Sequence, residues 1–379
     1  MNIRRNPERS RAILVALDIG RASQAEDRAD EATRLVQSAG AQVVQVIRGR
    51  RDRPDAATFA GSGKVDEIKR AMLLHRSDIV VFDDQLSASQ VRNLERVLAE
   101  GSAGVRVFDR TDVILDIFAQ RARTNEGKLQ VELARLEHLS TRLVRGWTHL
   151  ERQRGSLGKT GGPGEKQIEL DRRMIGEQVK KLKQRLKKVD KVRATQRAGR
   201  ARSGILRVAI VGYTNAGKST LFNRLTRADA YVADKLFATL DTTTRRVYLG
   251  EGAHITLSDT VGFIRDLPHM LVEAFKATLQ ESVQADLLLH VVDSANPRYH
   301  EQIDDVNAVL AEIGAGDIPQ LVVYNQIDRS GLAPEVMRDP HGKILNIKVS
   351  AFTGAGIEEL REVLADAARG AAHPLPTAA

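Results

Sequence analysis

The stretch "ILRVAIVGYTNAGKSTLFNRL", residues 205–225, decides the fold of the second half of the chain. Its apolar start predicts a buried β-strand that ends at Gly212, and the residues after Lys218 have helical spacing. Gly212, Gly217, Lys218 and Ser219 satisfy the pattern G-x-x-x-x-G-K-[ST]. Between a strand and a helix, this pattern predicts a phosphate-binding loop, with Lys218 at the β- and γ-phosphates and the Ser219 hydroxyl on Mg²⁺.

The segment that follows indicates which class of nucleotide-binding protein this is. "RRVYLGEGAHITLSDTVG", residues 245–262, predicts a β-hairpin with its turn at "GEG". It ends in Asp259 and Gly262, a D-x-x-G pattern in which the carboxylate holds Mg²⁺ through a water molecule and the glycine N–H bonds the γ-phosphate. An antiparallel strand before this aspartate indicates a Ras-like G domain, because helicase-type ATPases have parallel crossovers there.

A threonine-rich segment lies between these two motifs. "KLFATLDTTTR", residues 235–245, has the polar composition of a switch, in which one threonine reaches Mg²⁺ only while the γ-phosphate is present. Thr239, Thr242, Thr243 and Thr244 are all candidates for that role, and their spacing does not choose among them.

The apolar run "LVVYNQID", residues 321–328, ends in Asn325 and Asp328, the two fixed positions of a guanine-reading loop. Asp328 can accept hydrogen bonds from N1–H and N2–H₂ of guanine, whereas adenine would set a lone pair against the carboxylate. Most such loops have lysine where this chain has Gln326. We expect this difference to change nucleotide affinity more than the choice of base. The motif order predicts a G domain over residues 205–371, with a disordered tail at 372–379.

The first 118 residues alternate apolar runs with amphipathic stretches, which predicts an N-terminal parallel α/β domain. The stretch "GSGK", residues 61–64, resembles a phosphate loop, but the required glycine is replaced by Thr58. We therefore expect a turn into a helix at this point.

Residues 119–204 have the pattern of a long helical hairpin. From about Ile117 the pattern changes to long helices. Apolar residues recur at spacings of three and four from Leu129 to Trp147 and again from Ile168 to Val189, which predicts two antiparallel helices of roughly thirty residues, each about 45 Å long. Between them lies the glycine-rich tip "GSLGKTGGPGEKQ", residues 155–167. Residues 166–202 contain fourteen Lys and Arg against four Asp and Glu, a local net charge of +10. This local charge exceeds the net charge of the whole chain, +9. So concentrated a charge indicates a nucleic-acid partner bound through phosphates and shape.

Composition excludes several other classes of protein. The chain has 42% apolar and 28% charged residues, which fits a folded, water-soluble protein of this length. Because it has no cysteine, disulfide frameworks and thiolate metal sites are excluded. The N-terminus has neither a signal peptide nor a membrane span, so we expect a cytoplasmic monomer, with peripheral membrane association left open.

The whole chain resembles the HflX-type GTPases, a ribosome-associated family. The stretches that carry the resemblance are "VFDDQLSASQVRNLE" (81–95), "GGPGEKQIELDRR" (161–173) and "LFATLDTTTR" (236–245). The resemblance implies GTP hydrolysis coupled to binding of the large ribosomal subunit and its rRNA, with separation of stalled or stress-inactivated ribosomes. It also implies that Thr239 is the switch ligand of Mg²⁺. The residues expected to contact the ribosome are Lys159, Gly161, Gly162, Pro163, Gly164, Lys166, Arg172 and Arg173.

Two positions bear on the catalytic mechanism. Many GTPases orient the attacking water with a glutamine after D-x-x-G, where this chain has Phe263, so we expect slow intrinsic hydrolysis that the ribosome stimulates. Asn215 either ligates K⁺, a candidate second cation that would act like an arginine finger, or only tolerates an unusual loop backbone. Two other functions remain open: an RNA-binding or large-subunit assembly factor that separates nothing, and a promiscuous NTPase acting on RNA.

The predicted nucleotide site joins residues from five loops. Lys218 and Gly262, with Asn215 as a further candidate, are the predicted catalytic residues, and Ser219, Thr239 and Asp259 are the predicted metal ligands. The residues predicted to contact GTP or GDP are Gly212, Tyr213, Thr214, Asn215, Ala216, Gly217, Lys218, Ser219, Thr220, Phe237, Ala238, Thr239, Leu240, Asp241, Asp259, Thr260, Val261, Gly262, Asn325, Gln326, Ile327, Asp328, Ser350, Ala351 and Phe352.

Overall fold

The structure is a computed structural model that describes residues 10–20, 25–99, 104–145, 170, 172–189, 204–227, 236–250 and 252–370. The chain forms two compact units. The N-terminal unit comprises Met1–Gln120 and Val131–Arg185, and the C-terminal unit comprises Arg121–Gln130 and Leu186–Ala379.

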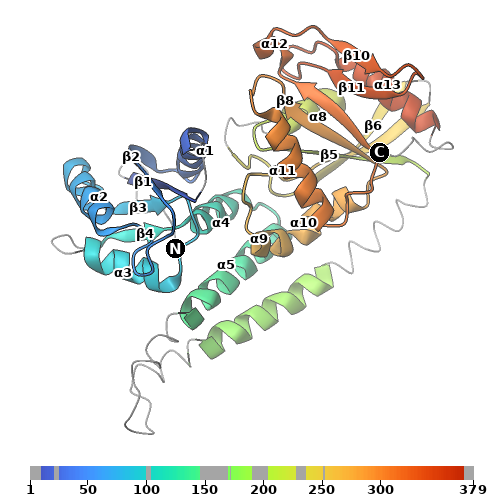
Figure 1. Ribbon diagram of the computed structural model, residues 1–379. Helices are drawn as coiled ribbons and strands as arrows, with labels where there is room; N and C mark the ends of the chain where they lie inside the picture. The colour runs from blue at the N-terminus through green and yellow to red at the C-terminus, as the bar shows by residue number, and fades with distance from the viewer. Residues whose placement is uncertain are drawn as a thin grey trace. The chain divides into compact units, whose positions relative to one another are not determined.

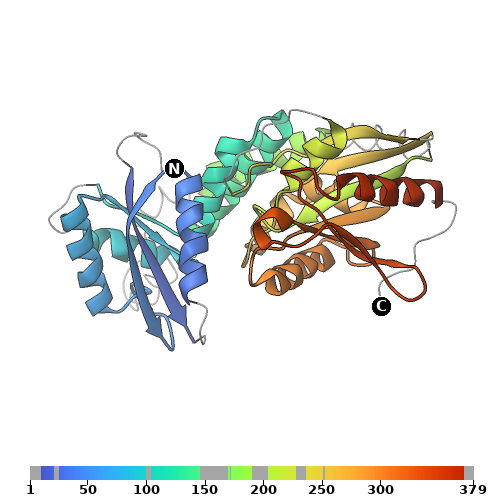
Figure 2. The ribbon, with the colours of Figure 1, turned by 90° about the horizontal axis from the view of Figure 1, so that it is seen from above.

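The N-terminal unit contains a parallel sheet flanked by helices, as the alternating sequence pattern predicts (Figure 2). Its strand order is β2-β1-β3-β4, and Figure 2 shows α1 and α2 on opposite sides of the sheet. "GSGK" begins α2, with Gly61 as the residue before the first turn, so this stretch is a turn into a helix. The elements are β1 (Arg11–Ile19), α1 (Ala25–Ser38), β2 (Gln42–Arg51), α2 (Ser62–His75), β3 (Ile79–Phe82), α3 (Ala88–Leu98), β4 (Arg106–Phe108) and α4 (Arg110–Arg121).

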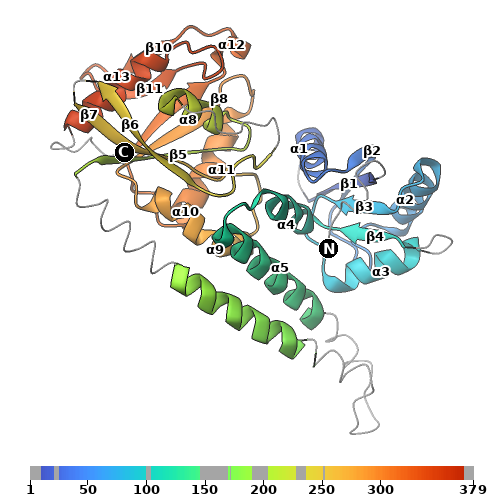
Figure 3. The ribbon, with the colours of Figure 1, turned by 180° about the vertical axis from the view of Figure 1, so that it is seen from behind.

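The middle of the chain is helical. Figures 1 and 3 show α5 (Asn125–Arg145) running alongside the helix of residues 172–189, and Lys183 Nζ lies 2.8 Å from Glu137 Oε1. The described parts of the two helices have 21 and 18 residues, and both adjoin residues outside the described part of the chain, so the predicted length of roughly thirty stays a prediction. At the start of this helical region α4 ends at Arg121 and α5 begins at Asn125, so the apolar positions from Leu129 onward lie on α5. Six of the predicted ribosome contacts, Lys159, Gly161, Gly162, Pro163, Gly164 and Lys166, lie outside the described residues.

The C-terminal unit has the predicted G-domain fold, a mainly parallel sheet of order β10-β11-β9-β8-β5-β7-β6. The predicted hairpin is confirmed, because β6 pairs with β7 in antiparallel fashion. The elements are β5 (Leu206–Gly212), α8 (Lys218–Thr226), β6 (Thr243–Gly250), β7 (Ala253–Asp259), α9 (His269–Ala274), α10 (Lys276–Val283), β8 (Leu287–Asp293), α11 (Tyr299–Glu312), β9 (Gln320–Asn325), α12 (Ile327–Ser330), β10 (Glu335–Arg338), β11 (Ile344–Lys348) and α13 (Ile357–Arg369).

The core of this unit explains where its loops gather. Apolar residues of α8 and α13 pack with alternate residues of the central strands, such as Val208 and Ile210 of β5, and all of these side chains are buried. Strands β5, β7, β8, β9 and β11 run parallel to one another, so their carboxyl ends lie at one edge of the sheet. Ligands of open α/β sheets bind at this edge. The phosphate loop, the D-x-x-G turn and the base loop all follow strands that end there.

No helix among the described residues is both long enough and apolar enough to span a membrane.

Candidate nucleotide-binding site

The phosphate loop turns sharply at both ends. Gly212 has a φ of 146° and Gly217 a φ of 90°, values that favour glycine. A Cβ atom on Gly212 would lie 2.2 Å from the carbonyl oxygen of Val291, and one on Gly217 would lie 2.2 Å from Asn325 Nδ2. Both glycines of the motif are therefore required by backbone conformation and by the close approach of β8 and β9.

Lys218 lies buried under this loop. Its ammonium group donates a hydrogen bond to the carbonyl oxygen of Tyr213, 2.7 Å away. Burial lowers the pKa of Lys218 to about 8, although the charge of Asp259 acts in the opposite direction. A phosphate group beside the loop would give this cation the anionic partner that favours its charged form.

Three oxygen-bearing side chains converge beside Lys218. Ser219 Oγ lies 2.8 Å from Thr239 Oγ1 and 2.8 Å from Asp259 Oδ2, and Thr239 Oγ1 lies 2.9 Å from the same carboxylate oxygen. Of the four candidate threonines, Thr239 is the one in this group. The hydroxyl of Thr244 instead lies 2.9 Å from Ser258 Oγ, on the hairpin.

This group of side chains fits a magnesium ion. Mg²⁺ prefers oxygen donors, and one carboxylate with two hydroxyls is a typical protein contribution. Burial raises the pKa of Asp259, so a nearby cation would favour its ionised form. The other carboxylate oxygen of Asp259, Oδ1, is buried without a hydrogen-bond partner among the described residues, so it can accept a bond from metal-bound water.

The D-x-x-G turn lies against the phosphate loop. A Cβ atom on Gly262 would lie 2.9 Å from both Lys218 Nζ and Thr214 Cγ2, so a larger residue would displace the lysine. The Phe263 N–H donates to the Gly212 carbonyl (3.1 Å), and the Thr214 N–H donates to the Phe263 carbonyl (2.7 Å). The Phe263 side chain is 1% exposed, so it fills the core and offers no group to an attacking water.

Asn325 connects the base loop to two neighbouring loops. Its buried side chain donates from Nδ2 to the Ala216 carbonyl and accepts from the Ala351 N–H, both at 2.9 Å. Ser350 Oγ donates to Asp328 Oδ1 at 2.6 Å and so fixes one carboxylate oxygen. The exposed Asp328 is thereby oriented, and each of its oxygens keeps a lone pair that could accept from a base.

Gln326 and Asn215 meet across the site. Gln326 Nε2 donates to the Asn215 carbonyl at 3.0 Å, so the amide makes a bond to the phosphate loop. Both residues have a left-handed backbone, with φ of 65° and 64°. Asn215 therefore does occupy the unusual conformation that one interpretation of this residue requires, since asparagine tolerates it better than most residues.

Several predicted contact residues turn their side chains elsewhere. Thr260 Oγ1 donates to the Ile210 carbonyl, and Phe352 is 78% exposed. Phe237 and Leu240 are buried. The Asp241 carboxylate binds the backbone of Arg123 and Thr124 instead of facing the phosphate loop.

Other contacts in the site have no counterpart in the predictions. The Tyr213 hydroxyl accepts from the Arg265 N–H at 2.7 Å and joins the phosphate loop to the segment after D-x-x-G. Arg224 Nε donates to the Ala351 carbonyl at 3.0 Å. No local sequence pattern marks these partners, which lie 52 and 127 positions apart.

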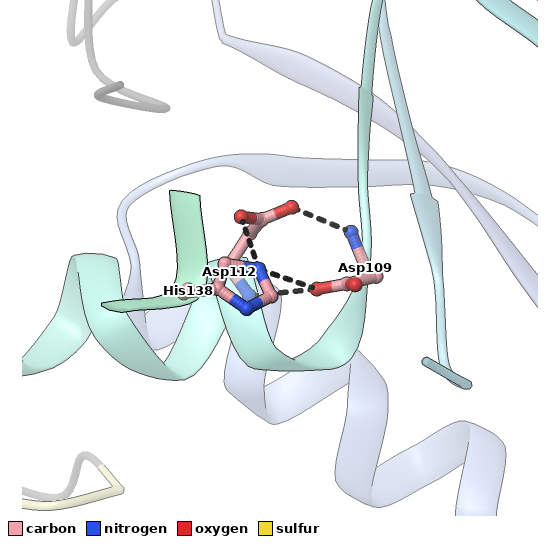
Figure 4. A group of neighbouring side chains, drawn as sticks. All are labelled: Asp109, Asp112 and His138. Carbon is pink, nitrogen blue, oxygen red and sulfur yellow. Dashed lines mark hydrogen bonds and ion pairs between the residues drawn. The ribbon is translucent and has the colours of Figure 1, made fainter. Parts of the chain in front are cut away.

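A second group of titratable side chains lies in the N-terminal unit (Figure 4). His138 Nε2 lies 3.2 Å from Asp112 Oδ1 and 3.9 Å from Asp109 Oδ1. Arg142 Nη2 lies 2.8 Å from Asp109 Oδ2 and 2.6 Å from Asp112 Oδ2, so a guanidinium already pairs with both carboxylates. A metal ion would face that positive charge, and we interpret the group as an ion-pair network that anchors α5.

Three family models together match most of residues 26–326. A model described as "GTP-binding GTPase N-terminal" matches residues 26–119, "GTP-binding GTPase Middle Region" matches residues 121–200, and "50S ribosome-binding GTPase" matches residues 207–326. The crystal structure of an SsGBP and GDP complex has a TM-score of 0.52 and 25% identity to this chain. The match covers 95% of this chain and 98% of that one.

Curated relatives are closer in sequence. GTPase HflX of Escherichia coli (strain K12) is 51% identical over 360 residues, which are 95% of this chain and 83% of the relative. GTPase HflX of Magnetococcus marinus is 50% identical over 337 residues, 87% of this chain and 75% of the relative. With the phosphate loop, the D-x-x-G turn and the base loop assembled at one edge of the sheet, these matches show that the chain belongs to the HflX family of GTPases.

Proposed function

We propose that the protein binds GTP and hydrolyses it to GDP and phosphate. The observation that carries this proposal is the convergence of Ser219, Thr239 and Asp259 within 2.9 Å of one another, beside the buried Lys218. Mg²⁺, when bound by Ser219 and Thr239 and by Asp259 through water, would neutralise charge on the β- and γ-phosphates.

Each loop then has a role with GTP. Lys218 donates to the β- and γ-phosphates, and the Gly262 N–H donates to the γ-phosphate as charge builds up on it. Asp328, oriented by Ser350, accepts from the guanine N1–H and N2–H₂. Because Phe263 has no polar side-chain group and is buried, the protein alone orients the attacking water poorly, and intrinsic hydrolysis is slow.

We further propose that the protein associates with the large ribosomal subunit and separates stalled ribosomes. The description of the matched G-domain model, "50S ribosome-binding GTPase", supports the first part of this proposal. The basic segment of residues 166–202 supports binding to rRNA, and its described part presents Arg172 and Arg173 on an exposed helix surface. The glycine-rich tip belongs to the same proposal.

Ribosomal subunits test this function directly. The protein should sediment with large subunits in the presence of a GTP analogue and much less with GDP. Subunits should accelerate GTP hydrolysis on the order of 100-fold, because the ribosome supplies or orders the missing water-orienting group. Equal hydrolysis rates with and without subunits would contradict this mechanism.

Light scattering distinguishes a ribosome-splitting factor from an RNA-binding or large-subunit assembly factor. A drop in the scattering of intact ribosomes on addition of protein and GTP is expected for a splitting factor. Binding without a drop would support an assembly factor instead.

Potassium dependence tests the role of Asn215. If its side chain ligates K⁺, replacing K⁺ with Na⁺ should slow hydrolysis by about tenfold, since a cation there stabilises charge in the transition state. Asn215→Gly is the matched variant, because glycine keeps the left-handed backbone and removes only the amide. A variant with unchanged hydrolysis in both salts would leave Asn215 with a backbone role alone.

A further inference from the structure

Asp241 makes an unusual contact for a residue so close to a magnesium ligand. It lies two positions after Thr239, and its carboxylate is directed at the break between α4 and α5. Oδ2 accepts from the Arg123 N–H at 2.7 Å and from the Thr124 N–H at 2.8 Å, while Oδ1 accepts from the Thr124 hydroxyl. Both carboxylate oxygens thus accept hydrogen bonds from residues that are distant in the sequence, with separations of 117 and 118 positions.

The contact suits the chemistry of a helix N-terminus. The first N–H groups of a helix have no partner within the helix, and the helix dipole favours an anion there. Thr124 is placed to begin α5, because its hydroxyl oxygen accepts from the Gly127 N–H at 3.0 Å. The same hydroxyl donates to Asp241, so the first turn of α5 and the switch segment share one hydrogen-bonded chain.

Gly127 gives independent evidence that the two segments fit each other. A Cβ atom at this position would lie only 2.2 Å from Asp241 Oδ1. A glycine in the first turn of α5 therefore leaves the space that the carboxylate occupies. Arg121–Gln130 belong to the same compact unit as the switch segment, whereas the rest of α5 belongs to the N-terminal unit.

We propose that Asp241 is a positioning residue that holds Thr239 at the magnesium site by anchoring the switch segment to the start of α5. This inference rests on the proposed function, because Thr239 acts there as the switch ligand of Mg²⁺. Leu240 between them is buried, so the segment is fixed on both sides of that residue. Since the switch threonine contacts the metal only while a γ-phosphate is present, the anchor favours the GTP complex over the GDP complex.

The coupling works in both directions. If anchoring raises the affinity for GTP, bound GTP must strengthen the anchor by the same factor. A partner that pulls the first turn of α5 away from Asp241 would therefore loosen Thr239 and weaken the GTP complex. Bound GTP thus strengthens the contact between Asp241 and the first turn of α5, and a change in that contact changes the affinity for GTP.

Nucleotide binding by the full chain tests the anchor. Asp241→Asn and Gly127→Ala should each weaken a non-hydrolysable GTP analogue about tenfold with Mg²⁺ present, and raise the Mg²⁺ concentration needed for half-maximal binding. The affinity for GDP should stay within about twofold, because that complex does not use Thr239. Thr124→Ala should behave alike, and Thr124→Ser, which keeps the hydroxyl, should restore binding of the GTP analogue.

Gly127→Ala separates anchoring from general stability. The added Cβ atom would displace the Asp241 carboxylate, so a merely structural role predicts lower thermal stability with both nucleotides weakened alike, whereas anchoring predicts selective loss of the GTP analogue. Gly176→Ala is the matched control, because a Cβ atom on that helical glycine would meet nothing within 4 Å. This control should leave both nucleotides unaffected.

Three outcomes would overturn the inference. Unchanged affinity for the GTP analogue in Asp241→Asn and Gly127→Ala would contradict the proposed role of Asp241, but it would not contradict the proposal that the protein binds GTP. Parallel loss of both nucleotides would mean that the contact only stabilises the unit. An unmodified protein that binds neither nucleotide would instead contradict the proposed function on which the inference rests.

Discussion

Replacing Asp328 with asparagine should lower GTP affinity by roughly 100-fold and let xanthosine triphosphate bind in its place. The carboxylate accepts from two donors of guanine, and each charged hydrogen bond contributes about 1.5–3 kcal/mol. An asparagine amide would set its NH₂ against the guanine amino group. Xanthine has a carbonyl at that position, so the amide can accept from N1–H and donate to the carbonyl. Competition between the two triphosphates for a fluorescent nucleotide measures the change.

The structure gives a reason to expect that Asp328→Asn changes the preferred base from guanine to xanthine, and the base loop also offers a control variant. Ser350 Oγ donates to Asp328 Oδ1 and can donate equally to an amide oxygen, so Asp328→Asn keeps this bond. Gln326→Lys is the contrasting variant: it should tighten GTP and GDP together and leave the choice of base unchanged. A preference of the unmodified protein for ATP would refute this account of the base loop.

Replacing Lys218 with alanine should abolish binding of both GTP and GDP, with affinity lowered by about 1,000-fold or more, as a buried charge pair is lost. The nucleotide-free protein should lose no thermal stability. Among the described residues, its buried ammonium donates a hydrogen bond only to the Tyr213 carbonyl, and burial lowers the pKa of Lys218, so the cation is held at a cost that the phosphates offset. Titration with fluorescent GDP and thermal unfolding of the empty protein measure the two effects.

Lys64→Ala is the control for this prediction. Lys64 ends the other Gly-Lys stretch, "GSGK", but it pairs with Glu67 at 2.8 Å on α2. This variant should bind nucleotide as the unmodified protein does. Full nucleotide binding by Lys218→Ala would show that the phosphate loop is not where GTP is held.

Local chemistry made most of the fold predictable. The phosphate loop has its glycines where the backbone turns, and the hairpin of β6 and β7 alternates apolar residues around a glycine turn. The alternation of strands and helices in the first 118 residues likewise indicates the parallel sheet. These features depend on residues that are close together in the sequence, so the spacing of apolar residues and glycines is enough to predict them.

Contacts between distant segments could not be predicted in this way. Spacing could not choose Thr239 among four threonines, because the choice depends on where β7 places Asp259. Periodicity also could not show where the break between α4 and α5 lies, because apolar spacing carries no record of the Asp241 carboxylate that accepts from the backbone N–H groups of Arg123 and Thr124.

The strand order of the N-terminal sheet has a consequence for self-association. β2 lies at one edge of that sheet, so the outer backbone of this ten-residue strand could template another strand. Its second half is "IRGRR", in which Arg48 and Arg50 are exposed. If the β2 strands of two copies began to pair through this edge, the positively charged arginines of the two strands would repel each other. The arginines thus protect the sheet against aggregation, in addition to any part they play in binding.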